Sequence, residues 1–449
     1  MPVKPALCGL FAVLLLFAAA SARAALPIQH WQTPGGARVY FVENHDLPMA
    51  DVSVEFPAGA AYDSEQKSGA ASMTQRLLRL GADGMNEDDI ARGIADVGAQ
   101  LGGNFNTDRA GLSLRTLSSR EERTRALDIL GRLLQRPVFP AAVLEREKAR
   151  LVAALKEADT KPDTIAGRAF YRMLYREHPY ALRSTGEVAT VQRLTRDDLV
   201  AFHRRHYVVN RAVIALVGDL TRAEAERIAE QLVSGLPRED SVQVDLPPVP
   251  PVPSAQTDII PHPATQSHIM MGVPGISRHD PDYFPLVVGN HILGGGGFVS
   301  RLTEEVRTKR GLAYSAYSYF SPLLRQGPFL IGMQTQREQA QQALDVTRAT
   351  LREFLTRGPT EEELIAAKKN IIGSFPLRID SNRDIHGYLA VIGFYRLPLT
   401  YLDDYIKNVE KVTVADIRSA FSRRIDPERM VTVVVAGEAT GAAAAQAPN

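Results

Sequence analysis

Two histidines, His203 and His206, lie three residues apart in the segment HRRH, and no other histidines of this 449-residue chain are as close. Imidazole is a common zinc ligand, and two histidines at this spacing on a helix can share a metal ion. No nearby carboxylate stands at a helical offset that faces both rings. We therefore predict that the pair marks the end of a helix rather than a metal site.

Other familiar catalytic motifs are missing from the sequence. It contains neither HExxH nor GxSxG, and its one cysteine, Cys8, lies in the apolar N-terminal run. The glycine run 294–297 is not followed by the Lys-Ser/Thr of a phosphate-binding loop, and it lacks the glycine spacing of a dinucleotide-binding loop. The net charge of +1 gives no basic excess of the kind that nucleic-acid-binding proteins carry. Serine or cysteine hydrolases, nucleotide binding and nucleic-acid binding are therefore excluded.

The segment 69–81 reads GAASMTQRLLRLG and has the pattern of an amphipathic helix. Its apolar residues recur along one face, at Ala70, Met73, Leu77 and Leu80. This segment and the downstream VGAQL (97–101) resemble the insulinase or pitrilysin-type metallopeptidases, a family that includes the mitochondrial processing peptidase and the bc1 core proteins. In that family the helix carries an inverted HxxEH motif. Its histidines bind zinc, and its glutamate acts as the general base on a zinc-bound water.

The resemblance places Ser72, Gln75 and Arg76 at the three working positions of HxxEH. Ser72 offers a neutral hydroxyl, and the permanently cationic Arg76 would repel a metal ion. Gln75 cannot accept a proton from water, so the general base is missing. The third ligand position falls at Ala153 or Ala154, in a helix that begins EREK, and alanine has no donor atom. We therefore expect a catalytically incomplete chain that binds no zinc and no other cofactor.

The second half keeps a different part of the family's site. The segment 293–317, LGGGGFVSRLTEEVRTKRGLAYSAY, resembles a glycine-rich loop followed by an arginine and a tyrosine seven residues apart, here Arg307 and Tyr314. The resemblance implies that both side chains hydrogen-bond the substrate beside the scissile bond. A guanidinium and a phenol are suitable donors to the negative charge that develops there. It also implies that the loop meets the substrate through Gly294, Gly295, Gly296 and Gly297.

The elements that hold these residues occur twice. LTRDDLVAF (194–202) is echoed about 218 residues later by VTVADIRSAF (412–421), and each precedes a β-branched run that ends in glycine. The helical patterns at 143–154 and 361–372 form another such pair. A repeat of this length predicts an α+β fold of two homologous halves, each an antiparallel sheet backed by helices. The resemblance implies a clam-shell formed with a second, similar subunit.

A proline-rich segment, LPPVPPVPS at 246–254, separates the halves and favours an extended spacer. We expect the two halves to pack separately on either side of it. The expected divisions are an N-terminal peptidase-like domain at 25–240, a linker at 241–256, a C-terminal peptidase-like domain at 257–440 and a disordered tail at 441–449.

The first 24 residues have the features of a secretory signal peptide. Lys4 precedes the apolar run 6–20, and Ala22-Arg23-Ala24 is a small-x-small cleavage site. The run is shorter than the roughly 20 apolar residues that span a bilayer. No later stretch approaches that length without a charge, so no integral membrane segment is expected in the mature chain. We expect cleavage of this segment and export to the periplasm.

These observations predict the non-catalytic, substrate-binding subunit of a periplasmic heterodimeric zinc metallopeptidase. Its partner would be a homologous chain that carries HxxEH and the zinc, and its substrate a peptide held by strand addition to a sheet edge. Two alternatives stay open, a structural subunit like the bc1 core proteins and a stand-alone peptide-binding homodimer without proteolysis. Retention of Arg307 and Tyr314 argues against the structural subunit, because a scaffold needs neither.

Overall fold

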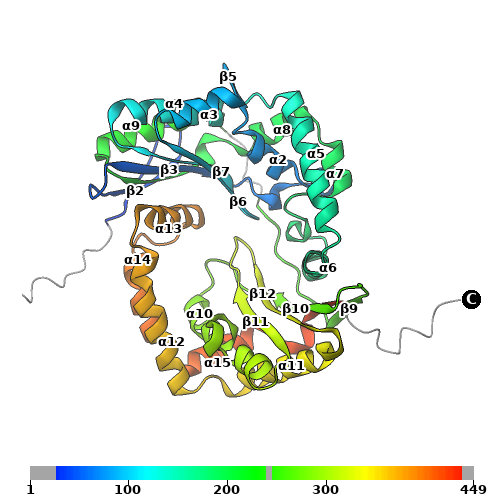
Figure 1. Ribbon diagram of the computed structural model, residues 1–449. Helices are drawn as coiled ribbons and strands as arrows, with labels where there is room; N and C mark the ends of the chain where they lie inside the picture. Colours follow the sequence, from blue (N-terminus) through cyan, green and yellow to red (C-terminus); the bar gives the residue numbers. More distant parts are fainter. Residues whose placement is uncertain (1–26, 239–244, 437–449) are drawn as a thin grey trace, which may run out of the picture.

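The computed structural model describes residues 27–238 and 245–436. The expected signal peptide (1–24) and tail (441–449) lie outside these residues, and so do residues 241–244 of the expected linker. Within them, two mainly antiparallel sheets are each accompanied by helices, one in each half of the chain (Figure 1). The α+β fold of two halves is confirmed. No helix among the described residues has the length and apolar character needed to cross a membrane.

The N-terminal half is built on a six-stranded sheet with the order β1-β2-β8-β3-β7-β6. Its strands are β1 (Gln29–Gln32), β2 (Arg38–Glu43), β3 (Met49–Phe56), β6 (Gln100–Phe105), β7 (Ala110–Leu117) and β8 (Val213–Gly218). A small separate hairpin is formed by β4 (Gly81–Ala82) and β5 (Met85–Asn86). The helices are α2 (Ala70–Leu77), α3 (Glu87–Ala95), α4 (Arg120–Gln135), α5 (Ala141–Ala158), α6 (Pro162–Tyr175), α7 (Val188–Arg193), α8 (Arg196–His206) and α9 (Arg222–Val233).

The C-terminal half is built on a five-stranded sheet with the order β11-β12-β10-β13-β9. Its strands are β9 (Gln256–Ile260), β10 (Gln266–Pro274), β11 (Ala313–Phe320), β12 (Pro328–Gln336) and β13 (Val431–Val435). The α-helices are α10 (Tyr283–Asn290), α11 (Ala340–Arg357), α12 (Glu361–Ser374), α13 (Asn382–Tyr395), α14 (Tyr401–Lys411) and α15 (Val414–Arg424). Two short π-helical turns, η6 (His291–Gly295) and η8 (Thr303–Thr308), flank the glycine-rich loop.

The two sheets repeat the same topology. Written from the other side, the second order is β9-β13-β10-β12-β11, which matches β2-β8-β3-β7-β6 strand for strand. Each sheet also contains one parallel pair, β2 with β8 and β9 with β13, where the sequence predicted antiparallel strands only. The echoed segments begin with the same device, because Thr195 and Thr413 each close a capping box at the start of α8 and α15.

Equivalent helices of the two halves are exchanged. Helix α6 packs against β10 and β13 of the C-terminal sheet, and its repeat α13 packs against β2, β3 and β8 of the N-terminal sheet (Figure 1). Phe170 of α6 shares a buried cluster with Val433 of β13. Gly393 lets α13 approach the other sheet closely, since a Cβ there would lie 2.6 Å from Val213 and 2.7 Å from Tyr40. The expectation of two separately packed halves is therefore wrong.

A single buried carboxylate, Asp108 in the turn between β6 and β7, also joins the halves. It accepts hydrogen bonds from the hydroxyls of Tyr180 at 2.7 Å and of Tyr395, at the end of α13, at 2.9 Å. The backbone N–H of Leu324, between β11 and β12, donates to it at 2.8 Å. Desolvation raises the pKa of Asp108, while these hydrogen bonds act to lower it. The contacts tie one turn of the N-terminal sheet to two elements of the C-terminal half.

The proline-rich segment 246–254 is packed against the protein rather than extended into solvent. Its apolar side chains Leu246, Val249 and Val252 are buried in the cluster that contains Phe170 and Tyr175 of α6. The segment leads into β9 and follows the surface between the exchanged helix and the C-terminal sheet. The domain boundaries drawn around it stay a prediction.

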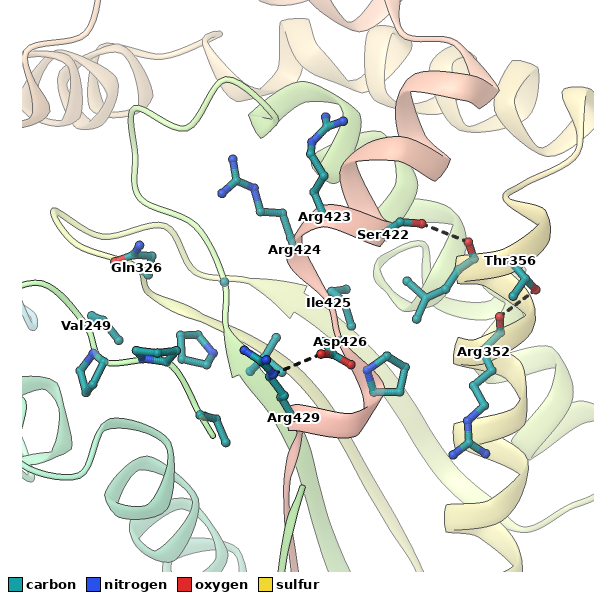
Figure 2. Close-up of a pocket in the computed structure, with 18 residues that line it drawn as sticks. Val249, Gln326, Arg352, Thr356, Ser422, Arg423, Arg424, Ile425, Asp426 and Arg429 are labelled. Atoms are coloured by element: carbon teal, nitrogen blue, oxygen red, sulfur yellow. Dashed lines mark hydrogen bonds and ion pairs between the residues drawn. The ribbon is translucent and has the colours of Figure 1, made fainter. Parts of the chain in front are cut away.

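A pocket of 980 Å³ lies between this segment and the C-terminal half, as Figure 2 shows. Four arginines line it, and all four are paired with carboxylates; Arg352 contacts Glu428 at 3.8 Å. Arg423 contacts Asp282 at 2.6 Å, and Arg424 contacts Asp282 at 3.0 Å. Arg429 contacts Asp426 at 3.4 Å (Figure 2). The pairs of Arg423 and Arg424 join the end of α15 to the start of α10, and the pair of Arg429 lies in the loop between α15 and β13. Little unpaired charge is left for a ligand.

Candidate functional site

Helix α2, which carries the positions of the missing zinc motif, is held at its N-terminus by a buried carboxylate. Asp63 accepts hydrogen bonds from the backbone N–H groups of Gly69 at 2.7 Å and Ala71 at 2.8 Å. Gly69 has φ +97°, a left-handed conformation that glycine adopts without strain. Burial raises the pKa of Asp63 from 3.8 to about 7, while the two backbone hydrogen bonds act to lower it.

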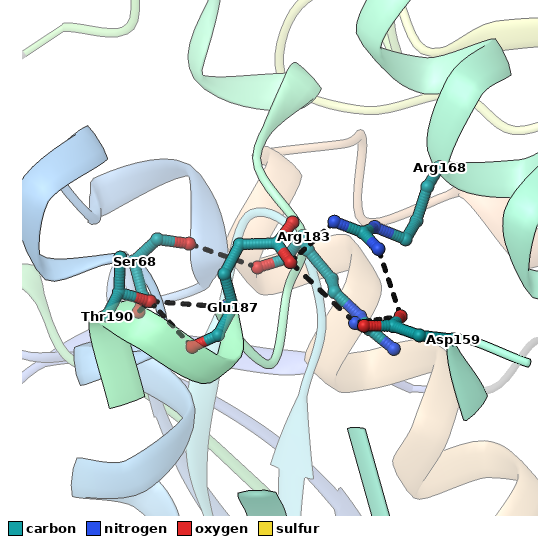
Figure 3. Close-up of polar contacts among 6 residues, drawn as sticks. All are labelled: Ser68, Asp159, Arg168, Arg183, Glu187 and Thr190. Carbon is teal, nitrogen blue, oxygen red and sulfur yellow. Dashed lines mark hydrogen bonds and ion pairs between the residues drawn. The ribbon is translucent and has the colours of Figure 1, made fainter. Parts of the chain in front are cut away.

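Polar contacts with other segments hold Ser68, which lies two residues before the start of α2. The hydroxyl of Thr190 donates to the backbone oxygen of Ser68 at 2.7 Å, and the Ser68 hydroxyl donates to the backbone oxygen of Arg183 at 3.3 Å (Figure 3). The Arg183 guanidinium contacts Asp159 at 2.9 Å, and Arg168 of α6 contacts the same carboxylate at 3.0 Å. Figure 3 shows Glu187 completing this cluster of two arginines and two carboxylates. The start of α2 is thus tied to the end of α5 and to the middle of the exchanged helix α6.

We expect Asp63 to make stability depend on pH. Its pKa is higher in the folded than in the unfolded chain, so between about pH 4 and 7 only the native state holds the proton. Its contribution is complete below pH 3.8, and the free energy of unfolding falls as pH rises through 7, by as much as about 4 kcal/mol. Asp63→Asn should remove this dependence, measured by urea unfolding at several pH values.

The control for this experiment is Asp128→Asn, a half-exposed carboxylate on α4 that pairs with Arg132 at 3.0 Å. Its pH dependence should match that of the wild type. Equal slopes for wild type and Asp63→Asn would show that Asp63 does not titrate in this range.

Two of the three positions expected to carry the zinc motif, Gln75 and Arg76, have other partners. Gln75 is buried, and its Nε2 donates to the backbone oxygen of Gly111 at 3.3 Å. It lies directly over Gly103 of β6, where a Cβ would come within 2.0 Å of that nitrogen. Ser72 is half-buried, and Arg76 is exposed. A neutral amide therefore fills the place of the expected general base and takes part in packing.

Arg76 forms an ion pair that the sequence analysis did not predict. Its Nε lies 2.6 Å from a carboxylate oxygen of Glu147 on α5, whose side chain is only 2% exposed. Arg146 at 3.1 Å and Arg150 at 2.9 Å contact the same carboxylate. Burial acts to raise the pKa of Glu147, but the hydrogen bonds from Arg146 and Arg76 outweigh it and the pKa is lowered.

The signal for this pair was present in the EREK segment (145–148), whose third residue is Glu147. The third metal-ligand position predicted from the sequence falls instead at Ala153 or Ala154, and both are exposed on α5. Glu147 is a buried glutamate on α5, and a buried carboxylate needs a cationic partner. Arg76 of the neighbouring helix α2 is one such partner. The residues present therefore fit an arginine–carboxylate pair and do not fit zinc.

Metal ligation elsewhere has no support within residues 27–238 and 245–436, where no three His, Cys, Asp or Glu side chains are grouped to hold an ion. His203 and His206 are both buried in the last turn of α8, which ends at His206, so the predicted helix end is confirmed. The His203 ring hydrogen-bonds the backbone oxygen of Leu134 at 2.9 Å. Burial lowers the pKa of each histidine to about 4, which keeps both rings neutral.

In the C-terminal half the structure brings Arg307 and Tyr314 together. The guanidinium carbon of Arg307, on η8, lies 4.6 Å from the ring centre of Tyr314, near the start of β11. The ring of Phe298 lies 4.9 Å from the same carbon, an aromatic contact that the sequence analysis missed. Phe298 and Tyr314 are 74% and 77% exposed. Two exposed rings thus hold the guanidinium by cation–π contacts.

The guanidinium of Arg307 keeps its donors available. Among the described residues it has no hydrogen-bond or ion-pair partner, whereas nearby Arg310 is paired with Glu305 at 2.6 Å. Cation–π contact uses the face of the guanidinium and leaves the N–H groups along its edge free to donate. The stack can therefore present both guanidinium and phenol donors to an acceptor in solution.

The glycine-rich loop leads directly into this stack. Gly294 is buried against β11, where a Cβ would lie 2.4 Å from the Ser318 hydroxyl. Gly297 has φ +63°, and it allows the turn after which Phe298 projects from the surface. Gly295 and Gly297 are exposed, and Gly296 is half-buried. Close packing against β11 requires a glycine at position 294, and the left-handed backbone conformation favours a glycine at position 297.

Both groups of residues adjoin an edge strand. Strand β6, which carries Gly103, and strand β11, which carries Tyr314, each end their sheet on one side. An edge strand offers unpaired backbone groups to which an extended peptide can add. The two groups themselves lie in different halves of the chain (Figure 1).

Comparison with known proteins places the chain in a family. Residues 38–186 match the family model "Insulinase (Peptidase family M16)", and residues 193–371 match "Peptidase M16 inactive domain". The "Non-peptidase homolog YmxG" of Helicobacter pylori is 25% identical over 407 residues, which are 89% of this chain and 92% of that protein.

Solved structures share the fold. The "peptidase M16 inactive domain" from Pseudomonas fluorescens is 38% identical and superposes with a TM-score of 0.89, over 92% of this chain and 99% of that one. The periplasmic protease PqqL from Escherichia coli has a TM-score of 0.78 at 14% identity, over 92% of this chain and 45% of that one, which shows the fold alone. This chain therefore belongs to the insulinase family, peptidase family M16, as an inactive homologue.

Proposed function

We propose that this chain is the non-catalytic, substrate-binding subunit of a periplasmic heterodimeric zinc metallopeptidase. The observation that carries the proposal is the exposed stack of Phe298, Arg307 and Tyr314, in which the guanidinium has no partner among the described residues. Unpaired donors held in place by two exposed rings are of no use to a scaffold. They suit a surface that meets a ligand with an acceptor oxygen.

The chain's own part in the reaction would be to hold the peptide and stabilise charge. An extended peptide would add to an edge strand through backbone hydrogen bonds. Arg307 and Tyr314 would then donate to the peptide carbonyl oxygen that becomes negative during hydrolysis. A homologous partner subunit with HxxEH would hold the zinc. In this chain Arg76 forms an ion pair with Glu147 at 2.6 Å, and that pair leaves no ligand for a metal ion.

The proposed export to the periplasm is supported by the first 24 residues, which contain Lys4, the apolar run 6–20 and the Ala22-Arg23-Ala24 site. Two other functions remain to be separated from this one by experiment, a structural subunit and a peptide-binding homodimer. A structural subunit would need neither Arg307 nor Tyr314, and a homodimer would bind peptide without cleaving it.

The proposal is tested by purifying the chain alone and together with an HxxEH-carrying homologue from the same genome. The chain alone should contain no stoichiometric zinc and should cleave no peptide, because Arg76 and Gln75 supply neither ligand nor base. The co-purified pair should contain about one zinc and should hydrolyse peptides until a chelator removes the metal. Metal analysis and a peptide digest make the measurement.

The partner subunit by itself is the matched control, and it should show zinc but much lower activity. One zinc per chain together with chelator-sensitive cleavage by this chain alone would contradict the proposal. Peptide binding without cleavage by any combination would favour the homodimer.

A further inference from the structure

A pocket of 520 Å³ lies beside the position of the missing zinc motif. It is open to solvent and lies between α2, α3, α5 and β6. Its charged lining consists of Arg76, Arg79, Arg150, Glu87 and Glu147, and the rest of its lining is apolar. The lining therefore combines an apolar wall, contributed mostly by α3, with three guanidinium groups.

The carboxylates of this pocket are already neutralised. Glu147 is contacted by Arg76, Arg146 and Arg150, and Glu87 is contacted by Arg146 at 2.7 Å. Three guanidinium groups and two carboxylates therefore line the pocket, an excess of one positive charge. The family resemblance implies a zinc ion near Arg76, but the positive charge of this pocket favours an anion instead.

Arg79 is the least satisfied of these arginines. Its Nε is buried and has no hydrogen-bond partner among the described residues. Desolvation, and secondarily the charge of Arg76, lower the pKa of Arg79. A buried donor without an acceptor is costly, and an anion bound in the pocket would remove that cost.

The pocket adjoins an edge strand. Leu101, which forms part of its wall, belongs to β6, the last strand of the N-terminal sheet. A peptide that adds to β6 places alternate side chains on opposite faces, so one set of them lies on the pocket side. A glutamate side chain matches the lining, because its methylene groups fit the apolar wall and its carboxylate fits the guanidinium groups.

We propose that this pocket binds the carboxylate of an acidic side chain, glutamate above all, in a peptide added to β6. The inference rests on the proposed function, since it names the class of peptide that the subunit selects. It assigns the selection above all to Arg79, whose Nε has no partner among the described residues, with Arg150 and Arg76, which both contact Glu147, as its cationic neighbours.

The test measures binding of three labelled peptides to the purified full chain by fluorescence anisotropy. The peptides share an alternating threonine-valine sequence and differ at one central position, which is glutamate, glutamine or lysine. The glutamate peptide should bind about 10-fold more tightly than the glutamine peptide, as a charge-assisted hydrogen bond predicts, and the lysine peptide most weakly. In Arg79→Gln and Arg150→Gln the preference for glutamate should fall to about 2-fold or less.

Two control variants separate the loss of the pocket's charge from a general effect of replacing an arginine. Arg79→Lys retains the charge and should retain part of the preference. Arg92→Gln removes an exposed arginine of α3 that does not line the pocket, and it should bind all three peptides like the wild type. Thermal unfolding confirms that each variant is folded.

Equal binding of the glutamate and glutamine peptides by the wild type would overturn this inference and leave the proposed function standing. Failure to bind any of the three peptides would overturn both. Inorganic phosphate separates a free anion from a peptide carboxylate. If phosphate stabilises the wild type but not Arg79→Gln, while the glutamate and glutamine peptides bind alike, the pocket holds small anions and the peptide assignment is wrong.

Discussion

Replacing Arg307 by alanine is expected to lower peptide hydrolysis by the reconstituted pair about 10²–10³-fold, although the metal is on the other chain. The guanidinium lies 4.6 Å and 4.9 Å from two exposed rings and has no partner among the described residues. Its removal should therefore take a donor from the reacting carbonyl oxygen without breaking an ion pair. The turnover number of the pair is the measurement, and size-exclusion chromatography shows whether the complex remains intact.

Tyr314→Phe tests the contribution of a single hydroxyl group to the same reaction. The phenyl ring keeps its contact with Arg307 and only the hydroxyl is lost, so any fall in turnover belongs to that donor. The ring is 77% exposed, and stability should hardly change.

Arg310→Ala is the matched control for both variants, because Arg310 lies on the same segment and is already paired with Glu305 at 2.6 Å. It should leave turnover close to that of the wild type. Full activity in Arg307→Ala and Tyr314→Phe would mean that the stack takes no part in the reaction, and the structural-subunit alternative would then be favoured. Loss of the complex would move these residues to the subunit interface.

Replacing Asp108 by alanine is expected to destabilise the chain by about 3 kcal/mol or more. The change leaves the hydroxyls of Tyr180 and Tyr395 and the N–H of Leu324 without their acceptor, all in a buried place. Each unsatisfied donor costs about 1–3 kcal/mol. Because these groups come from both halves, the halves should also come apart more easily. Urea unfolding gives the stability, and hydrogen exchange at α13 reports the opening.

Asp96→Ala is the control for the Asp108 experiment. Asp96 contacts Arg125 at 3.6 Å, with both side chains more than half exposed, so its loss should cost less than about 0.5 kcal/mol. Asp108→Asn keeps one acceptor oxygen and should fall between the two. A change of less than about 1 kcal/mol in Asp108→Ala would show that the carboxylate does not hold the halves together.

Local patterns were enough to predict the elements that repeat. The echoed segments 194–202 and 412–421, the apolar periodicity of α2 and the β-branched runs of β8 and β13 are patterns that act over a few neighbouring residues. Such signals are readable in a linear sequence, and their recurrence after about 218 residues predicted the two halves. The absence of HxxEH at Ser72, Gln75 and Arg76 is likewise a property of the sequence alone.

Long-range contacts decided what the sequence could not. A helix pattern shows that α6 and α13 bury one face, but it does not say which sheet covers that face, and each packs on the sheet of the other half. The partner of Arg76 is 71 residues away, and the ring of Phe298 reaches Arg307 only because the glycine-rich loop turns at Gly297. Local periodicity determined the elements of this protein, whereas its charge pairs, its aromatic stack and the exchange of helices arose only when distant segments were packed together.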